Sequence, residues 1–438
     1  MEDRELFQAG RYREIVKKYG RNLEELEQEE LNILCKSYYK MKEYQNTLKT
    51  FDVYVKKGYP KEELLLYYTW CMYQVYMNIE HPVRVTVIKA LKLIIGHCKQ
   101  EDTYYPYTCA VFKVLSLAKE DKITLTNEEQ YKIIMLLDPK KLSSIQTVRQ
   151  EEDRQIKFPS DYEKWYTYAT KITYDMKNYE ETIQLCSDIT GKRKKTRNTN
   201  LTFHLAMYIR SASKINTKWY EYRMAQSYEK LGDTEEAIAI YEELKLKNED
   251  FCFSSALGKL YETQGQLVLA NRYYYEALTS RAGSLKNKVG VIEKVADLLA
   301  ADGENEKAKL NYMLVEQIRK KELWRPSEAI STKLQRLSHV EVACEEAELE
   351  KTCKSQWNKQ SLSYLEEGTG KVVRILPNKK AGFIQMEDRQ LYFSVKSIRR
   401  DHDIESYLEK TVKFYIKESF DTKKNCKSYE AVRISKVK

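Results

Sequence analysis

Histidine and cysteine, the side chains that most often carry nucleophilic, acid–base or metal chemistry, are scattered through this sequence. The five histidines stand far apart, and no two of the nine cysteines are separated by only two residues. His339, Cys344 and Cys353 come nearest to a ligand set, but their spacing matches no zinc motif, and we expect them on a surface helix. There is no phosphate-cradling glycine loop, no Gly-x-Ser-x-Gly elbow and no His-Glu-x-x-His helix. We therefore expect a protein that is not an enzyme and that uses no cofactor or metal ion.

Length and composition favour a cytoplasmic protein with more than one domain. A chain of 438 residues can fill several cores, and its 14 glycines and 7 prolines leave few turns, which favours long helices. The first five residues are acidic, and no apolar core with a small-residue cleavage site follows them, so we expect no secretory signal. The most apolar stretch, 83–96, is interrupted by three basic side chains, so we expect no membrane span. An odd number of scattered cysteines fits reduced thiols.

One five-residue pattern recurs three times, with steps of 3, 4, 5 and 4 residues. Its members are a small residue, a tyrosine or leucine, a glycine, an alanine and a tyrosine: Ala225, Tyr228, Gly232, Ala237 and Tyr241; Gly258, Tyr261, Gly265, Ala270 and Tyr274; Ala296, Leu299, Gly303, Ala308 and Tyr312. Small residues let two antiparallel helices approach closely, and glycine suits the left-handed end of the first helix. The pattern resembles the tetratricopeptide (TPR) repeat, which implies an array of antiparallel helix pairs.

Weaker copies of the pattern extend the array toward the N-terminus. One copy spans residues 35–51, and another is centred on the turn at 177–179. Residues 60–158, between these two copies, are expected to be helical, but the sequence does not assign their repeat register. A helix from Ser327 to about Leu337 is expected to cap the array. The fold class expected is mainly α: a TPR-type solenoid over 1–338, a polar helical spacer over 339–365, and a small five-stranded β-barrel over 366–438.

In such an array the first helix of each pair lines the concave side, where a partner peptide could bind. The residues in that register are Trp219, Tyr222, Gln226, Glu229, Ser255, Lys259 and Glu262. For each of them an ordinary solvated helix face is the alternative. The basic run 191–198 could likewise contact nucleic acid or an acidic partner, or simply be a solvated loop.

Five short strands are predicted in the last 70 or so residues, at 370–376, 381–386, 390–395, 411–416 and 429–434. This density of strands suggests an OB-type barrel. Over 369–437 the sequence resembles a cold-shock domain, through Gly370-Lys371-Val372, Gly382-Phe383-Ile384 and Leu391-Tyr392-Phe393. In that family, surface aromatics stack on the bases of single strands and basic residues neutralise the phosphates.

The resemblance implies a nucleic-acid-binding set of basic and aromatic residues on the barrel. The set is Lys371, Arg374, Lys379, Lys380, Phe383, Tyr392 and Phe393. Arg374 stands where the family has an exposed tryptophan, and Ala381, Ser394 and Val395 replace other members of its platform. Phe383 and Tyr392 remain of the usual stacking platform, and the planar guanidinium of Arg374 can partly replace what is lost.

Charge favours nucleic-acid binding by the barrel. Residues 366–438 hold 17 Lys and Arg against 11 Asp and Glu, so this region carries +6 of the total charge of +10. We therefore expect an adaptor that binds single-stranded RNA, or else DNA, through the barrel and an unidentified protein through the array. The alternative is a protein-interaction scaffold whose barrel no longer binds nucleic acid. The combination is similar to repeat-plus-OB proteins of bacterial regulatory or conflict systems.

Overall fold

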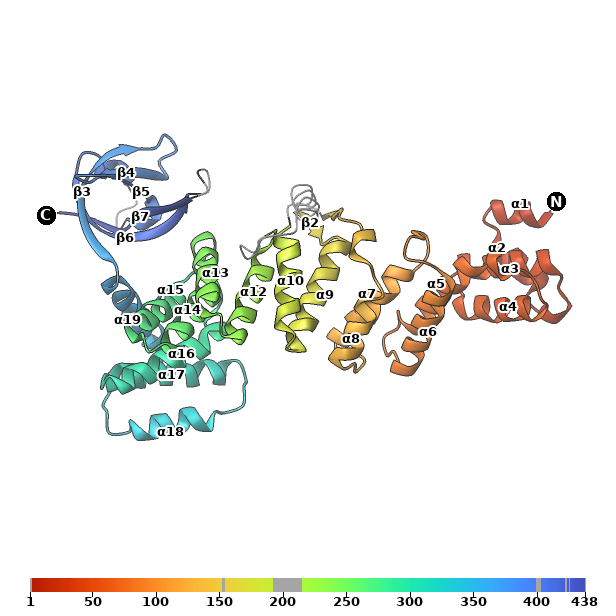
Figure 1. Ribbon diagram of the computed structural model, residues 1–438, viewed down its shortest axis with the longest axis horizontal. Helices are drawn as coiled ribbons and strands as arrows, with labels where there is room; N and C mark the ends of the chain where they lie inside the picture. The colour runs from red at the N-terminus through yellow and green to blue at the C-terminus, as the bar shows by residue number, and fades with distance from the viewer. Residues whose placement is uncertain are drawn as a thin grey trace. The chain divides into compact units, whose positions relative to one another are not determined.

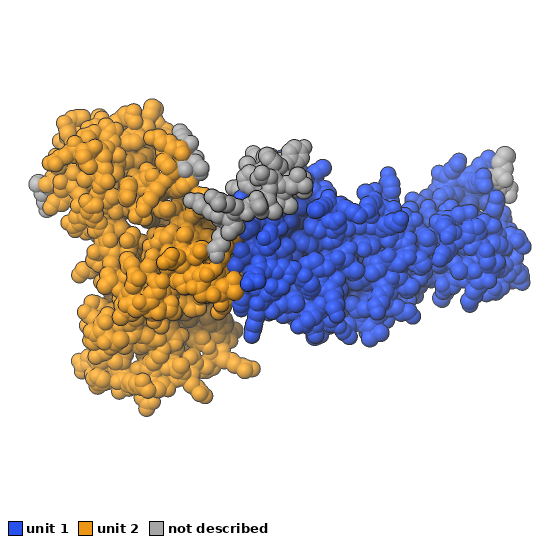
Figure 2. All heavy atoms as spheres, in the orientation of Figure 1, with its two compact units in different colours: residues 1–223 blue, residues 224–438 orange. Residues whose placement is uncertain are grey.

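The computed structural model describes residues 2–151, 154–191, 215–398, 403–421, 424 and 426–437. They form two compact units, residues 1–223 and 224–438 (Figure 2). Helices dominate both units, and a closed five-stranded barrel follows the helices of the second (Figure 1). The predicted fold class, mainly α with a small C-terminal β-barrel, is confirmed. Within the described ranges no helix combines the length and the apolar character needed to cross a bilayer.

The first unit is a succession of short antiparallel helices. They are α1 (Glu2–Gln8), α2 (Tyr12–Tyr19), α3 (Gln28–Lys40), α4 (Tyr44–Lys56), α5 (Leu65–Tyr76), α6 (Arg84–His97), α7 (Tyr107–Lys119), α8 (Asn127–Ile134), α9 (Asp161–Asp175) and α10 (Tyr179–Thr190). The predicted pairs α3–α4 and α9–α10 are present, and they turn at Lys42 and Lys177, which take left-handed φ angles of 61° and 63°. Of the basic run 191–198, only Gly191 lies within the described residues; it ends α10 with a left-handed φ of 68°.

One part of the helical prediction for 60–158 is wrong. Strands β1 (Thr147–Glu151) and β2 (Arg154–Phe158) pair as an antiparallel hairpin. The segment contains β-branched and aromatic residues, such as Val148, Ile156 and Phe158, which suit an extended chain. Every residue of β1 is exposed, so no buried helical stripe exists there to specify a helix.

The second unit continues with α12 (Lys218–Leu231), which spans the boundary between the units, and with further helices. These are α13 (Thr234–Lys247), α14 (Phe251–Thr263), α15 (Leu267–Thr279), α16 (Val289–Ala301), α17 (Asn305–Lys321), α18 (Glu328–Arg336) and α19 (Leu349–Ser363). The three repeats of the sequence pattern correspond to the pairs α12–α13, α14–α15 and α16–α17. Their turn glycines Gly232, Gly265 and Gly303 have φ angles of 86°, 73° and 81°, the left-handed conformation that the sequence predicted.

Small residues at the predicted positions allow the helices of each pair to pack closely. Ala237, Ala270 and Ala308 are completely buried. At Gly258 an added Cβ atom would lie 2.7 Å from the ring of Tyr274, closer than real contacts allow. The small residues of the pattern therefore lie where two helices approach each other closely.

The helical part of the second unit ends with α19. The helix predicted from Ser327 to about Leu337 is present as α18, and Ser327 caps its N-terminus, since its side chain accepts from the Ile330 amide. However, α19 follows and packs against α15 and α17. Leu349, Cys353 and Trp357, spaced by four residues, form its buried stripe, so the expectation of a surface helix and a free polar spacer has to be corrected over 349–363.

The barrel contains the five predicted strands, of which the first and the last two are longer than expected. They are β3 (Glu366–Ile375), β4 (Ala381–Gln385), β5 (Gln390–Ser394), β6 (Thr411–Asp421) and β7 (Cys426–Lys436). The strand order is β3-β4-β5-β7-β6, closing back onto β3, and only β5 and β7 run parallel. Inward-facing side chains fill the barrel, among them Val372, Ile384, Leu391, Phe393 and Phe414.

Candidate functional site

Three of the residues predicted to bind nucleic acid lie side by side across three neighbouring strands. Arg374 on β3 is paired with Phe383 on β4, which is paired with Tyr392 on β5. The Arg374 guanidinium carbon lies 4.5 Å from the centroid of the Phe383 ring. The Phe383 and Tyr392 ring centroids are 5.9 Å apart with the planes inclined at 73°. We call these three residues the β3–β5 row.

Strand alternation explains why the row faces outward. Leu391 and Phe393 point into the core, so Tyr392 between them faces solvent and is 41% exposed. On β3 a bulge between Val372 and Arg374 shifts the register and turns Arg374 outward. Phe383 lies half-buried between its two neighbours.

Phe393, also predicted to stack on bases, is completely buried in the barrel core, and this assignment is corrected. Two consecutive strand residues cannot both face outward, and Tyr392 takes the outer position. Gly382 makes room for Phe393: a Cβ atom on Gly382 would lie 2.7 Å from the Phe393 ring. Phe393 therefore belongs to the barrel core and not to the binding surface.

The four predicted basic residues divide into two paired and two unpaired ones. Lys371 forms an ion pair with Glu409, and Lys379 one with Glu405 at 2.9 Å. Arg374 and Lys380 are exposed and have no ion-pair partner among the residues that the structure describes. Exposed pairs contribute about 1 kcal/mol or less, so a phosphate could compete with Glu405 or Glu409.

The sequence reasoning missed a second exposed aromatic residue close to the row. Tyr429 is 39% exposed and precedes Glu430, the residue of β7 paired with Tyr392. The Arg389 guanidinium carbon lies 5.6 Å from its ring centroid. The sequence analysis placed Tyr429 in the last strand without predicting that it is exposed. Its exposure depends on where β7 leaves the barrel, and strand alternation alone does not predict that position.

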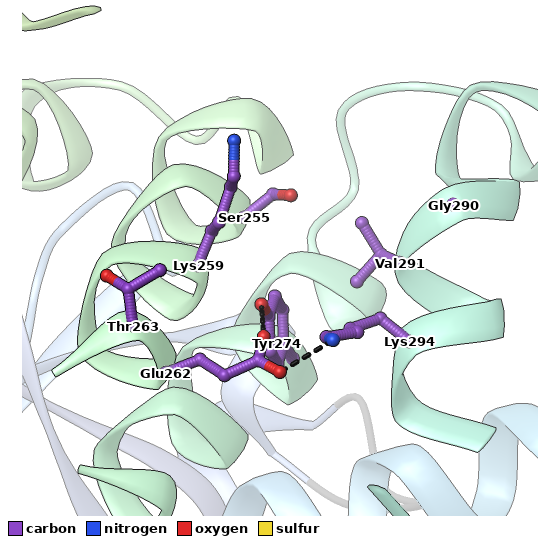
Figure 3. A pocket seen from close by; sticks show the side chains of 8 residues that line it. All are labelled: Ser255, Lys259, Glu262, Thr263, Tyr274, Gly290, Val291 and Lys294. Carbon is purple, nitrogen blue, oxygen red and sulfur yellow. Dashed lines mark hydrogen bonds and ion pairs between the residues drawn. The ribbon is translucent and has the colours of Figure 1, made fainter. Parts of the chain in front are cut away.

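On the helices, three predicted groove residues line a hollow of about 500 Å³. Ser255, Lys259 and Glu262 project from α14 (Figure 3). The other walls are formed by Thr263 of α14, Tyr274 of α15, and Gly290, Val291 and Lys294 of α16. The hollow therefore lies between the first helices of two successive pairs, as the repeat register implies.

Ion pairs join each first helix to the next. Their shortest N–O distances are 3.5 Å for Glu229–Lys259, 2.6 Å for Glu262–Lys294 and 2.7 Å for Asp297–Lys333. We call this series, which runs from α12 through α14 and α16 to α18, the ion-pair ladder.

A tyrosine from the second helix of a pair supports the ladder at two points. The Tyr274 hydroxyl donates to Glu262 at 2.7 Å, and the Tyr312 hydroxyl donates to Asp297 at 2.5 Å. Burial, together with the hydrogen bond to Glu262, raises the pKa of Tyr274, so the phenol stays protonated and remains a donor.

The four predicted groove residues of α12 share one face of that helix. Trp219, Tyr222, Gln226 and Glu229 follow one another at steps of three, four and three residues. Trp219 is 48% exposed, and its ring meets that of Tyr222 edge-on at 5.8 Å. Trp219 and Tyr222 belong to the first unit, whereas Gln226 and Glu229 belong to the second.

The three residues considered for zinc do not converge. The Cys344 thiol contacts the Thr352 hydroxyl at 3.6 Å, whereas Cys353 is buried, and burial raises the pKa of its thiol to about 12. Within the described ranges no group of three or more His, Cys, Asp or Glu side chains could hold a metal ion.

The protein thus combines an array of helix pairs with a closed barrel that carries a row of aromatic and cationic side chains. A family model described as a domain of unknown function (DUF7017) matches residues 218–358. The match begins at the first residue of α12 and ends within α19, so it includes α19 with the helices and leaves the barrel outside. No curated protein matches the chain.

Proposed function

We propose that the protein is a non-catalytic adaptor. Its barrel binds single-stranded nucleic acid, RNA by preference, and its helical array binds a protein partner. The observation that carries the proposal is the β3–β5 row, in which Arg374, Phe383 and Tyr392 occupy adjacent strands on one outer surface. Unpaired bases of RNA stack on such aromatic rings and on arginine planes.

The geometry of the row suits a small number of stacked bases. Tyr392 is 41% exposed, while Arg374 already covers one face of Phe383. A base can therefore stack on Tyr392 directly and on the outer side of the guanidinium plane. Each stacked base contributes about 1–3 kcal/mol.

The strand order further supports a nucleic-acid-binding barrel. The first three strands are sequential neighbours, and the last strand runs parallel to the third, as in the OB-type barrel that the sequence suggested. Oligonucleotides bind OB folds on the face that the second and third strands form, which here carries Phe383 and Tyr392. The resemblance to the cold-shock domain gives the same location.

The test is a titration of fluorescent ten-nucleotide uridine and thymidine strands with the full chain at several salt concentrations. Phe383→Ala and Tyr392→Ala should each weaken binding by about 1–3 kcal/mol with little change in salt dependence. Lys380→Ala should reduce the slope of log affinity against log salt by about 0.7, the value of one phosphate contact on a single strand. Lys379→Ala should reduce it less, because Lys379 must first leave Glu405.

Lys413→Ala is the matched control, since Lys413 is exposed on β6, paired with Thr369 at the other end of β3. This variant should bind as the wild type does, and circular dichroism must show that every variant is folded. If the folded wild-type protein binds neither strand at low salt, the adaptor proposal fails and the scaffold alternative replaces it.

The scaffold alternative has its own supporting observation, the hollow at Ser255, Lys259 and Glu262. Ser255→Arg would fill this hollow without removing a member of the ion-pair ladder. A partner protein that binds there should be lost from the Ser255→Arg variant but retained by Ser331→Arg, which places the same side chain on the exposed surface of α18. Equal retention by both variants would exclude the hollow as the partner site.

A further inference from the structure

β6 and β7 continue beyond the closed part of the barrel as a two-stranded ribbon. β3 pairs with β6 only as far as Ile416, and β5 meets β7 at Glu430. β6 and β7 themselves stay paired as far as Asp421 and Cys426. We call residues 417–421 and 426–429 the ribbon. Because an isolated pair of strands is marginally stable in water, the ribbon needs support from another part of the chain.

Helix α13 provides this support. It lies against β6, and the Lys247 ammonium is 5.3 Å from the ring centroid of Phe420, a cation–π contact. Phe420 is half-buried there. The contact joins the ribbon to a helix that precedes it by about 170 residues in the sequence.

Glu418, one of the two acidic residues of the ribbon, lies in the field of basic residues from two helices. Burial alone would raise the pKa of Glu418, but a hydrogen bond from Lys427 and the positive charges of Lys427, Lys245 and Arg272 lower it below the ordinary value of 4.5. Lys427 lies 2.8 Å from Glu418 on the neighbouring strand, whereas Lys245 and Arg272 belong to α13 and α15.

The helical side of this contact is held in place by its own interactions. Lys245 pairs with Glu276 at 3.1 Å and with Glu242 at 3.9 Å. Arg272 pairs with Glu276 at 3.3 Å, and Tyr273 donates to Glu242. We call these five residues the platform. It presents fixed positive and negative charges to the ribbon.

Lys427, on the other strand of the ribbon, is influenced by an acidic residue of α13. The hydrogen bond with Glu418 is the main cause that raises the pKa of Lys427, and the charge of Glu242 on α13 adds to it.

A separate contact holds the barrel near α19, where Arg433 donates to the Asn358 side-chain oxygen at 2.7 Å.

We propose that the ribbon is a docking arm that holds the barrel on the platform of its own chain by complementary charge. The positive charges of Lys245 and Arg272 act on Glu418, the negative charge of Glu242 acts on Lys427, and the Lys247 ammonium lies over the ring of Phe420. Docking involves β6 and β7, whereas the β3–β5 row lies on β3, β4 and β5, so the row does not take part in docking. Between about 0.1 M and 1 M salt the Debye length falls from about 10 Å to about 3 Å, so the docked barrel is released as salt rises.

The decisive variant exchanges two of the ribbon's four charged residues, Glu418→Lys together with Lys427→Glu. It keeps the ion pair within the ribbon and the net charge of the chain, but it reverses both charges that face the platform. Hydrogen exchange of the full chain, measured without nucleic acid, should be about fivefold or more faster in the ribbon and in the adjoining turn of α13. The matched control exchanges an ion pair on α17, Glu316→Lys with Lys320→Glu, and should leave both segments unchanged.

A second measurement uses the wild-type protein and a zero-length carbodiimide cross-linker. Lys427 should be joined to Glu242, and the yield should be compared with that of Glu243 and Lys247, which are 2.5 Å apart within α13. The ratio of the Lys427–Glu242 yield to the Glu243–Lys247 yield should fall about fivefold from 0.1 M to 1 M salt. Unchanged exchange in the ribbon variant, or a ratio that salt does not alter, would overturn the docking arm.

Discussion

The attachment of α19 to the helical core depends on Trp357, and this can be tested by a single substitution. Trp357 is 1% exposed, and its indole nitrogen donates to the Asn311 side-chain oxygen at 2.8 Å, where Asn311 is itself completely buried. Trp357→Phe leaves that oxygen without its donor, which costs about 1–3 kcal/mol. The smaller ring adds about 1–2 kcal/mol for lost packing. We expect the opening free energy of α19 to fall by about 2–5 kcal/mol.

The assay is native-state hydrogen exchange of the α19 amides in the full chain, because it reports the stability of one helix in a protein with several cores. Trp324→Phe is the matched control: Trp324 is 39% exposed in the same unit, so its effect should be about 0.5 kcal/mol or less. Adding Asn311→Leu to Trp357→Phe removes both partners of the hydrogen bond and should recover about 1–2 kcal/mol. If Trp357→Phe and Trp324→Phe have the same effect on α19, the helix is not anchored as described.

Three further predictions concern the helices. Ala270→Trp should overpack the completely buried contact between α14 and α15 and destabilise it by about 1–3 kcal/mol or more, so an unchanged thermal midpoint would contradict the repeat register. A glutamate-specific protease should cut first within 341–348, which contains four exposed glutamates. Trypsin should not cut after Lys351 or Lys354 of α19 at the same early times. Rapid tryptic cleavage after either lysine would mean that α19 is not packed against the other helices. Burial raises the thiol pKa of Cys71 and Cys186 to about 12 from the ordinary 9.0, so the folded state favours the neutral thiols. The free energy of unfolding should therefore decline as pH rises above about 9. Replacement of both cysteines by alanine should reduce that decline, measured as alkaline unfolding by circular dichroism.

The helix pairs of the second unit could be predicted because their signals are local. A glycine that ends one helix and an alanine five residues later each report a constraint within a single pair, and Gly232 and Ala237 illustrate this. The strands of the barrel were equally accessible from alternation and turns. Both kinds of pattern act over fewer than about 20 residues, the range in which sequence periodicity is informative.

The parts that could not be predicted depend on contacts between distant segments. α19 reads as a polar helix because it has a single narrow apolar stripe, and the partner of Trp357 lies 46 residues earlier in the chain. The hairpin at 147–158 has no buried face to mark it. In the candidate site, Phe383 and Tyr392 were identified correctly as neighbours on adjacent strands, but the ion pairs of Lys371 and Lys379 involve glutamates 38 and 26 residues away.

The ion-pair ladder makes the pairs α14–α15 and α16–α17 each compatible with a copy of itself. α14 offers Lys259 to the preceding first helix and Glu262 to the following one, and α16 repeats this arrangement with Lys294 and Asp297 at the same three-residue step. A duplicated α14–α15 pair would therefore meet the original with its lysine opposite Glu262, and no new contact would have to arise. Arrays of this kind can grow or shrink by whole pairs in evolution or in the laboratory, since each pair contacts only its neighbours.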